Sequence, residues 1–256
     1  LSAAQSVHGE IITSKGKAGI GTKFYAAATP ITYAFSSNDT LVNFTTGILA
    51  TEGGTTVTVS GYDPNIQFVN NTPSPLTVTF TLNKGQSYLL AGLMSQTTVN
   101  RAGFIGAKIV SNKPITVTNG NANGNFGASP SGSDLILDQS VPTNRLGNEF
   151  AMVKSLSQNP ADNMEGGIII ATENNTEIYL NNITLPVATI DEGGWYRINE
   201  NRYVNQGNGH SNMYIRTSKN VYLYQTVARD GSQSGGYNYI PPLNCFLPRK
   251  IDEIGK

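Results

Sequence analysis

Short alternating runs of apolar and polar residues recur along the whole chain, and helical periodicity is almost absent. In the clearest runs Val, Ile, Leu or Phe alternates with Thr or Tyr, as in 55–59, 76–82, 115–118 and 221–224. A period of two in these residue types is the pattern of half-buried β-strands. Gly, Asn and Pro interrupt the runs about every 8 to 12 residues, as expected of antiparallel sheets. The pattern predicts an all-β, antiparallel fold.

Two turn segments have closely similar sequences, ILATEGGTTVTV at 48–59 and IIIATENNTEIYL at 168–180. Their central pairs are Gly53-Gly54 and Asn174-Asn175. Gly and Asn both tolerate positive φ, which a two-residue type I′ turn requires at both central positions. The sequence therefore predicts the same tight β-hairpin at both places.

Further stretches repeat in the same order. The segment 82–88 resembles 190–196, with Gly85 and Gly193 predicted at a left-handed turn position, and 109–117 resembles 215–223. Each is predicted to be another hairpin, and each set follows a Gly-x-x-Phe strand start, at 21–24 and at 147–150. Four matched elements in one order indicate an internal repeat.

The repeat suggests a division of the chain into a lead-in at 1–20, a first β repeat at 21–140, a second at 141–239, and the start of a truncated third repeat at 240–256. Tandem repeats of about 105–125 residues are the right size for small β-sandwiches. The same hairpins would also fit the blades of a β-propeller, so that alternative stays open.

Charge and cysteine content limit the classes of partner. The 17 basic and 17 acidic residues balance, which argues against binding to nucleic acid or docking to an anionic membrane. No apolar run has the length of a membrane helix, so membrane insertion is not expected. The single cysteine, Cys245, allows neither an intramolecular disulfide nor a thiolate metal cluster.

Candidate catalytic chemistry is sparse. His8 and His210 have no metal-binding or catalytic neighbours in sequence. The glycine-rich stretch 120–127 is expected to be a mobile loop rather than a phosphate cradle. Acidic pairs such as Asp134 with Asp138 could suggest a glycosidase, but are expected to form turns and caps. We expect a non-enzymatic protein with no catalytic residues, no metal site and no cofactor.

Several turn and strand motifs resemble the N-terminal domain family of IgG Fc-binding protein. They are Ala171-Thr172-Glu173, the segment 82–88, Ser111-Asn112-Lys113-Pro114-Ile115, Ser133-Asp134-Leu135, Gln139-Ser140-Val141-Pro142 and the segment 147–150. The likeness extends from about residue 21 onward and is closest to the bacterial, cysteine-poor members. Cysteines that other members carry around Ser133-Asp134-Leu135 are missing here.

The resemblance implies an extracellular or cell-surface β domain in an adhesive protein, of the kind exported by type IX secretion and associated with gliding motility or adhesion. The expected partner is a protein or a glycan on a cell surface, and further repeats of the same kind are another candidate partner. A carbohydrate-active enzyme on a β scaffold and a passive structural spacer are the alternatives. These motifs specify a fold rather than a ligand.

Comparison of the repeats suggests a candidate ligand-binding face. Four small hydroxyl positions of the first repeat are aromatic in the second, at Tyr179, Trp195, Tyr222 and Tyr224, and Arg197 is predicted beside them. Aromatic side chains bury about 150–250 Å² each, so they could cover the neighbouring repeat. Tyr and Trp are also enriched in binding hot spots, so they could form a recognition surface.

Overall fold

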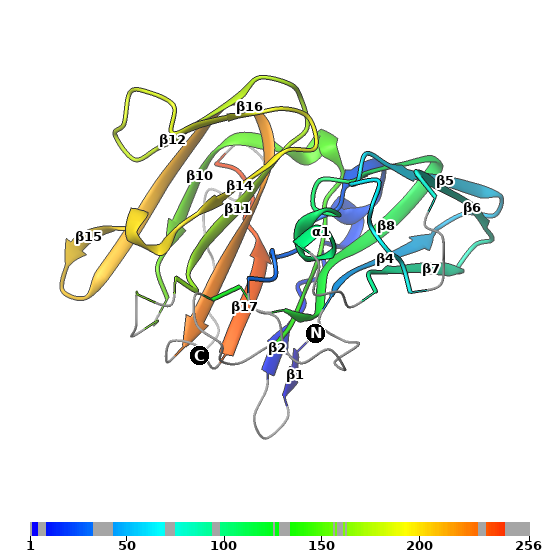
Figure 1. Cartoon of the computed structure of the whole chain (residues 1–256), viewed down its shortest axis with the longest axis horizontal. Coiled ribbons are helices and arrows are strands. Elements are labelled where there is room, and N and C mark those ends of the chain that lie inside the picture. The colour runs from blue at the N-terminus through cyan, green and yellow to red at the C-terminus, as the bar shows by residue number, and fades with distance from the viewer. Residues whose placement is uncertain are drawn as a thin grey trace.

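The computed structural model describes residues 2–4, 9–32, 43–69, 75–93, 98–124, 126–127, 134–155, 157, 161, 163–229 and 234–243. Within these ranges the strands form a sheet of seven strands, a sheet of eight strands and a small two-stranded ribbon. All pairings between them are antiparallel. Figure 1 shows the two large sheets side by side. The predicted all-β, antiparallel fold is confirmed.

The first sheet has the strand order β6-β5-β8-β4-β7, and β3 and β9 pair with the long strand β8. Its strands are β3 (Gly21–Tyr25), β4 (Phe44–Ala50), β5 (Thr55–Ser60), β6 (Thr77–Leu82), β7 (Ser87–Ala91), β8 (Lys108–Gly124) and β9 (Asp134–Gln139).

The second sheet has the corresponding order β13-β12-β16-β11-β14, and β10, β15 and β17 pair with the long strand β16. Its strands are β10 (Gly147–Val153), β11 (Gly166–Ala171), β12 (Thr176–Leu180), β13 (Ala188–Ile190), β14 (Trp195–Ile198), β15 (Val204–Gly207), β16 (His210–Arg229) and β17 (Ser234–Tyr239). With β15 as the only addition among the described strands, each strand of this sheet has a counterpart in the first.

Smaller elements flank the sheets. They are β1 (Ser2–Ala4) paired with β2 (Gly9–Ile11), the helix α1 (Thr98–Ala102) and the 3-10 helices η1 (Gly16–Gly19), η2 (Thr143–Arg145) and η4 (Glu200–Arg202). Of the segments assigned to a lead-in and a third repeat, 1–20 is largely described, whereas 244–256 lies outside the described residues.

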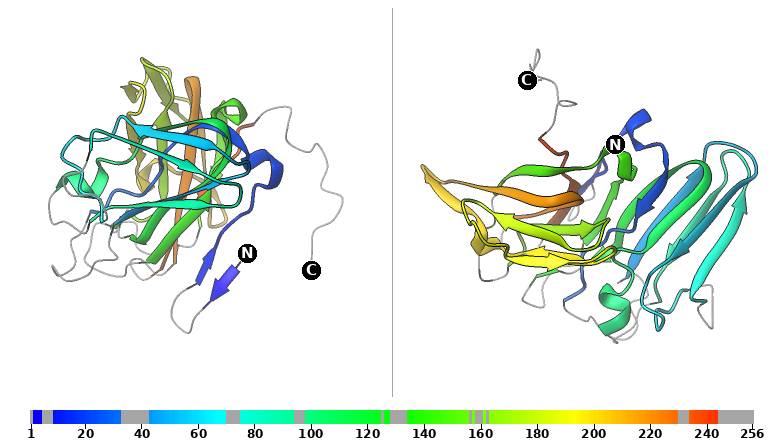
Figure 2. Two further views of the ribbon diagram at one scale, coloured as in Figure 1. Left: turned by 90° about the vertical axis from the view of Figure 1, so that its right-hand side faces the viewer. Right: turned by 90° about the horizontal axis from the view of Figure 1, so that it is seen from above.

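Each large sheet bends into two layers around its long strand. The first half of β8 pairs with β3 and β5, and its second half pairs with β4 and β9. In the same way, β16 pairs first with β10 and β12, and then with β11 and β17. Figure 2 shows this arrangement from two further directions. The result is sandwich-like and does not consist of four-stranded propeller blades.

The three predicted hairpins are wrong, because the flanking strands pair with other strands. Strand β4 pairs with β7 and β8, and β5 pairs with β6 and β8. Of the two central turn residues, φ is positive only at Gly54 and at Asn175. The segment 82–88 likewise joins β6 to β7, which are not paired, and 109–117 lies inside the continuous strand β8.

These repeated segments are instead the corners at which the chain passes between layers. Gly85 N–H donates to the Ala50 carbonyl, and Thr51 Oγ1 donates to the Pro114 carbonyl at 2.7 Å, which joins the three corners of the first sheet. The same bonds recur in the second sheet, from Gly193 N–H to Ala171 O and from Thr172 Oγ1 to Asn220 O at 2.9 Å. Gly85 and Gly193 both have φ of 78°, so their predicted left-handed conformation is confirmed.

Buried side chains form two clusters. The smaller lies between the layers of the second sheet and includes Phe150, Ile169, Ile215 and Leu223. The larger fills the first sheet and continues across to the adjoining face of the second. The larger cluster is therefore a shared core that is continuous between the two sheets. The sheets end close to the predicted boundaries at 140 and 239, although the domain division itself stays a prediction.

Candidate functional site

Tyr222 and Tyr224, two of the candidate binding residues, are fully buried between the sheets. Both lie on β16 with 0% of their surface exposed. Tyr222 Oη donates to the Val141 carbonyl at 2.6 Å, and Tyr224 Oη lies 2.5 Å from Ser140 Oγ. Burial raises the pKa of both phenols well above the ordinary value. Of the two roles considered for them, the structure places these side chains in an interface rather than on an exposed surface.

The second sheet contributes more aromatic rings to this interface. Tyr224 stacks on Tyr237 with ring centroids 4.5 Å apart and an interplanar angle of 3°. Tyr239 meets the ring of Tyr224 at an angle of 69°. Tyr237 and Tyr239 have no aromatic counterparts in the first repeat, where Leu137 and Gln139 pair with β8 at the equivalent positions. Sequence comparison missed them because the match between the repeats was not extended to this last strand.

Trp195 and Arg197 lie on β14, at the margin of the same interface. Trp195 is partly buried against the shared core. The Arg197 guanidinium donates to the Asn163 carbonyl and lies 5.6 Å from the ring centroid of Phe126. Burial lowers the pKa of Arg197 to about 10. Trp195 and Arg197 thus share the interface with Tyr222 and Tyr224.

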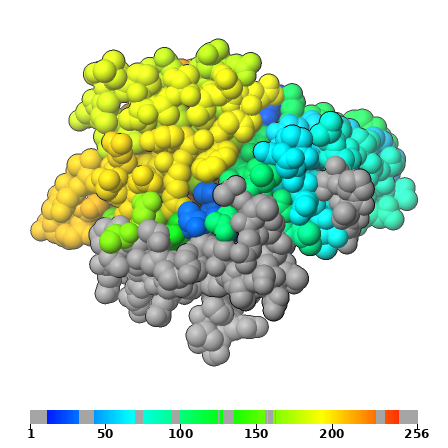
Figure 3. All heavy atoms as spheres, viewed as in Figure 1, coloured from blue at the N-terminus to red at the C-terminus, as the bar shows by residue number. Residues whose placement is uncertain are grey.

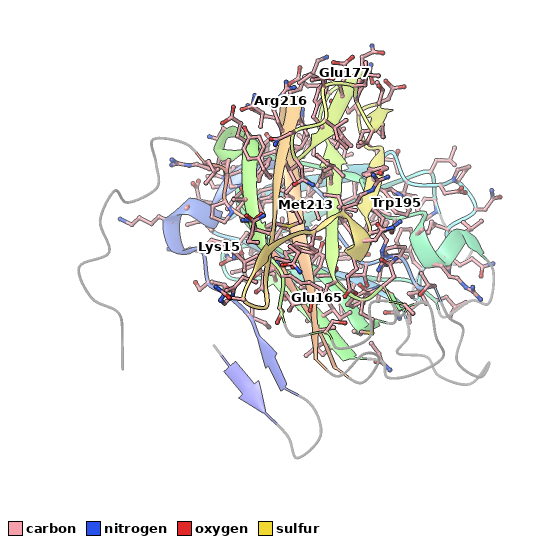
Figure 4. The ribbon with its side chains drawn as sticks, turned by 90° about the vertical axis from the view of Figure 1, so that its left-hand side faces the viewer. Lys15, Glu165, Glu177, Trp195, Met213 and Arg216 are labelled. Carbon is pink, nitrogen blue, oxygen red and sulfur yellow. The ribbon has the colours of Figure 1, made fainter. Side chains whose placement is uncertain are left out.

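Tyr179 is separated from the other four candidates, because β12 pairs with the first half of β16. This half belongs to the outer layer of the second sheet, the layer that faces away from the first sheet. Its hydroxyl donates to Glu177 Oε2 at 2.6 Å. The guanidinium of the exposed residue Arg216, directly opposite in register, lies 4.0 Å from the ring centroid of Tyr179. Figure 4 shows Arg216 and Glu177 at one end of the sheet, away from Trp195. An arginine stacked on a tyrosine combines an apolar plane with free donors.

Two buried carboxylates lie elsewhere in the second sheet. Glu165 accepts the backbone N–H groups of Ser155 and Ser157, at 2.6 and 2.7 Å. Lys154 Nζ lies 3.1 Å from Glu200 Oε1 and 3.9 Å from Glu165 Oε1. Burial raises the pKa of Glu165. Because backbone amides and a lysine already use these oxygens, the pair acts here as a structural ion cluster.

The acidic residues considered as turn formers divide into two kinds. Asp191 Oδ1 accepts the N–H of Asn175 at 2.9 Å and so serves the turn. Asp138, in contrast, is completely buried and accepts from Lys15 Nζ at 2.9 Å and from the N–H of Tyr239 at 2.8 Å. It therefore joins the N-terminal segment and both sheets. The side chain of Asp134 lies outside the described residues.

A sequence model of the family described as IgGFc binding protein matches residues 11–253. The chain belongs to the IgGFc binding protein family. A search of curated proteins and a search of solved structures each gave no match.

This family comprises extracellular binding proteins rather than enzymes. Among the described residues of this IgGFc binding family member, no group of three or more His, Cys, Asp or Glu side chains is placed to hold a metal ion. Over the same ranges, no helix is long and apolar enough to cross a membrane. His210 is exposed at the start of β16, and His8 lies outside the described residues.

Proposed function

We propose that the chain is a protein-binding adhesion module of a bacterial cell-surface protein, and that Tyr179 and Arg216 form the centre of its binding surface. The observation that carries this proposal is the stacked Tyr179–Arg216 pair on an accessible strand face. Tyr and Arg are among the residues that most often dominate the energy of protein interfaces. The low cysteine content fits the bacterial members that the motifs resemble.

The neighbouring residues suit this role. Glu177 holds the Tyr179 hydroxyl, and together with Arg216 it fixes the ring on both its edge and its face. A fixed aromatic ring loses little conformational entropy when a partner binds. In the first sheet the equivalent positions are Thr58 and Val110, which are paired in the same register. The first sheet therefore offers no equivalent surface.

Binding assays on the purified chain test the proposal. The probes are the Fc fragment of IgG, chosen from the family description, a glycan array and intact cells. The variant is Tyr179→Thr/Arg216→Val, which introduces the residues of the first sheet. The matched control is Arg202→Val, which removes an exposed arginine from η4.

We expect the wild-type chain and the control to bind Fc or a protein on cells, and the double variant to bind at least about tenfold more weakly at an unchanged melting temperature. Equal binding by the double variant would contradict the assigned surface. Binding confined to the glycan array would replace the protein partner with a glycan. No binding to any probe would favour the structural spacer.

A further inference from the structure

One face of the second sheet packs against the first sheet. This packing face consists of outward positions on β11, β14, β16 and β17, namely Ile168, Ile170, Trp195, Arg197, Tyr222, Tyr224 and Tyr237. Ile168, Ile170 and the three tyrosines are completely buried. At its edge, Glu192 accepts from Tyr25 Oη at 2.5 Å and from Lys108 Nζ at 2.9 Å.

The first sheet has a face at the same strand positions. By register, this open face consists of Gly47, Leu49, Ser87, Leu89, Thr116, Thr118 and Leu137. Leu49 is 40% exposed and Leu89 is 61% exposed, whereas Ile170, the counterpart of Leu49, is completely buried. A sheet face with exposed leucines among Ser and Thr positions thus remains accessible where the second sheet forms its interface.

The surface of the first sheet against which the packing face lies has a counterpart on the second sheet, and that counterpart is accessible. On the first sheet the surface includes Tyr25 and Lys108, which are paired across β3 and β8. The equivalent pair across β10 and β16 is Ala151 and Tyr214. In the second sheet this vacant receiving surface also includes Val153, which is 66% exposed, and Tyr214 is 38% exposed. Tyr179 and Arg216 border it.

At one pair of matched positions the charges of the two accessible surfaces are complementary. In the internal interface Glu192 of the second sheet lies near Lys108 and Lys23 of the first, and its pKa is lowered chiefly by the hydrogen bond from Tyr25 and further by these lysines. The counterpart of Glu192 on the open face is the exposed residue Lys84. The counterpart of Lys23 on the receiving surface is the exposed residue Glu149. The signs are exchanged, so opposite charges would again meet.

We propose that a second copy of this chain docks head to tail, with the open face of its first sheet on the receiving surface of the second sheet. Each molecule already contains one interface of this type. Its first sheet leaves the open face unoccupied, and its second sheet leaves the receiving surface unoccupied. In Figure 1, β10 lies in the left half of the molecule and β7 in the right half. Because the two surfaces differ, each added copy leaves one of each accessible, and association continues beyond a dimer.

Charge-exchange variants test this proposal by sedimentation velocity from micromolar to millimolar concentration at low salt. The wild-type chain is expected to form species larger than dimers as its concentration rises. Lys84→Glu and Glu149→Lys should each shift association to at least about tenfold higher concentration, because each places like charges opposite one another. The control Lys17→Glu makes the same charge change outside both surfaces and should associate like the wild type.

Mixing the Lys84→Glu chain with the Glu149→Lys chain gives the decisive result. The first variant carries negative charge on both surfaces and the second carries positive charge on both, so opposite charges meet wherever the two chains alternate. An equal mixture should therefore recover wild-type association. A wild-type chain that stays monomeric, variants that associate normally, or a mixture that does not recover would overturn the proposal. Growth that stops at a dimer would indicate a two-fold interface and would also overturn it.

Discussion

Single side chains show why the second sheet is stable only when it packs against the first. Tyr224 is completely buried, and its ring stacks on Tyr237. Its counterpart in the first sheet, Thr118, is only partly buried. A large aromatic ring is favourable at this position because the first sheet covers it within the same molecule, whereas a threonine is suitable at the position of Thr118, which the second sheet does not cover.

Replacing Tyr224 tests this difference at one position. Tyr224→Thr should lower the free energy of unfolding by about 3–5 kcal/mol, as for other buried aromatic truncations, because it leaves a cavity between the sheets. Tyr224→Phe should lower it by only about 1 kcal/mol, through loss of the bond to Ser140. Urea unfolding measures both changes. Equal effects of the two variants would show that the hydroxyl, and not the ring, dominates.

Glu165 should make stability depend on pH. Its folded pKa is raised above 4.5, chiefly by burial, so the folded protein keeps this proton to higher pH than the unfolded chain does. The contribution of Glu165 to the free energy of unfolding therefore falls as pH rises from 4.5 through the folded pKa, and is constant above it. Relative to Glu165→Gln, the wild type should lose stability across that window in urea titrations. A difference that does not vary with pH would contradict this sign.

At the scale of elements, the repeated motifs specify corners rather than hairpins. Thr51 and Thr172 donate to carbonyls of the long strands, and Lys113 and Lys219 donate to the carbonyls of Gly53 and Asn174. These bonds satisfy backbone groups at the places where the ladder of strand hydrogen bonds is interrupted. The motif therefore recurs because each sheet has to bend at the same place.

The two glycines of the first corner should respond differently to substitution. Gly54 has φ of 67°, and Gly53 does not have a positive φ. Gly54→Ala should cost about 1–2 kcal/mol because of left-handed strain. Gly53→Ala should be neutral or stabilising by up to about 1 kcal/mol, since nothing lies within 4 Å of the added methyl group. Thermal unfolding of both variants distinguishes this corner from a type I′ turn, in which both substitutions would be costly.

At the scale of the whole molecule, the two sheets are joined by a close interface. Gly106 approaches Gly193 so closely that a Cβ on Gly106 would lie 1.8 Å from the Gly193 carbonyl oxygen. Tyr25, Lys108 and Glu192 close the edge of the contact. In Figure 3 the atoms of the two sheets meet along a continuous boundary. Neither sheet can separate without exposing the shared core.

The two sheets should consequently unfold together. We expect calorimetry to give one transition whose van't Hoff and calorimetric enthalpies agree, because one apolar cluster spans both sheets. A fragment of residues 141–243 should be less soluble than one of residues 9–140, because it would expose Tyr222, Tyr224 and Tyr237. Two resolved transitions, or a soluble second fragment with a native melting temperature, would contradict a shared core.

The sequence by itself determined the strand periodicity, the matched elements of the repeat and the left-handed conformation of Gly85 and Gly193, because these depend on local backbone preferences. It also identified the family motifs. Tertiary structure decided the pairing partners, since a long strand competes with the nearest strand in sequence for the same hydrogen bonds. The stretch 120–127, expected to be a loop, shows this: its first five residues extend β8, where β9 pairs with them.

For the candidate site, too, the sequence determined one part and the tertiary structure the other. Sequence comparison found the aromatic positions, but alternation gives only the side of a strand and not what covers that side. Because the second sheet packs on the first sheet, Tyr222 and Tyr224 are buried. Tyr179 lies in the layer away from this contact and stays accessible beside Arg216. Which outward face meets solvent depends on how two complete sheets pack together, and only the tertiary structure determines that.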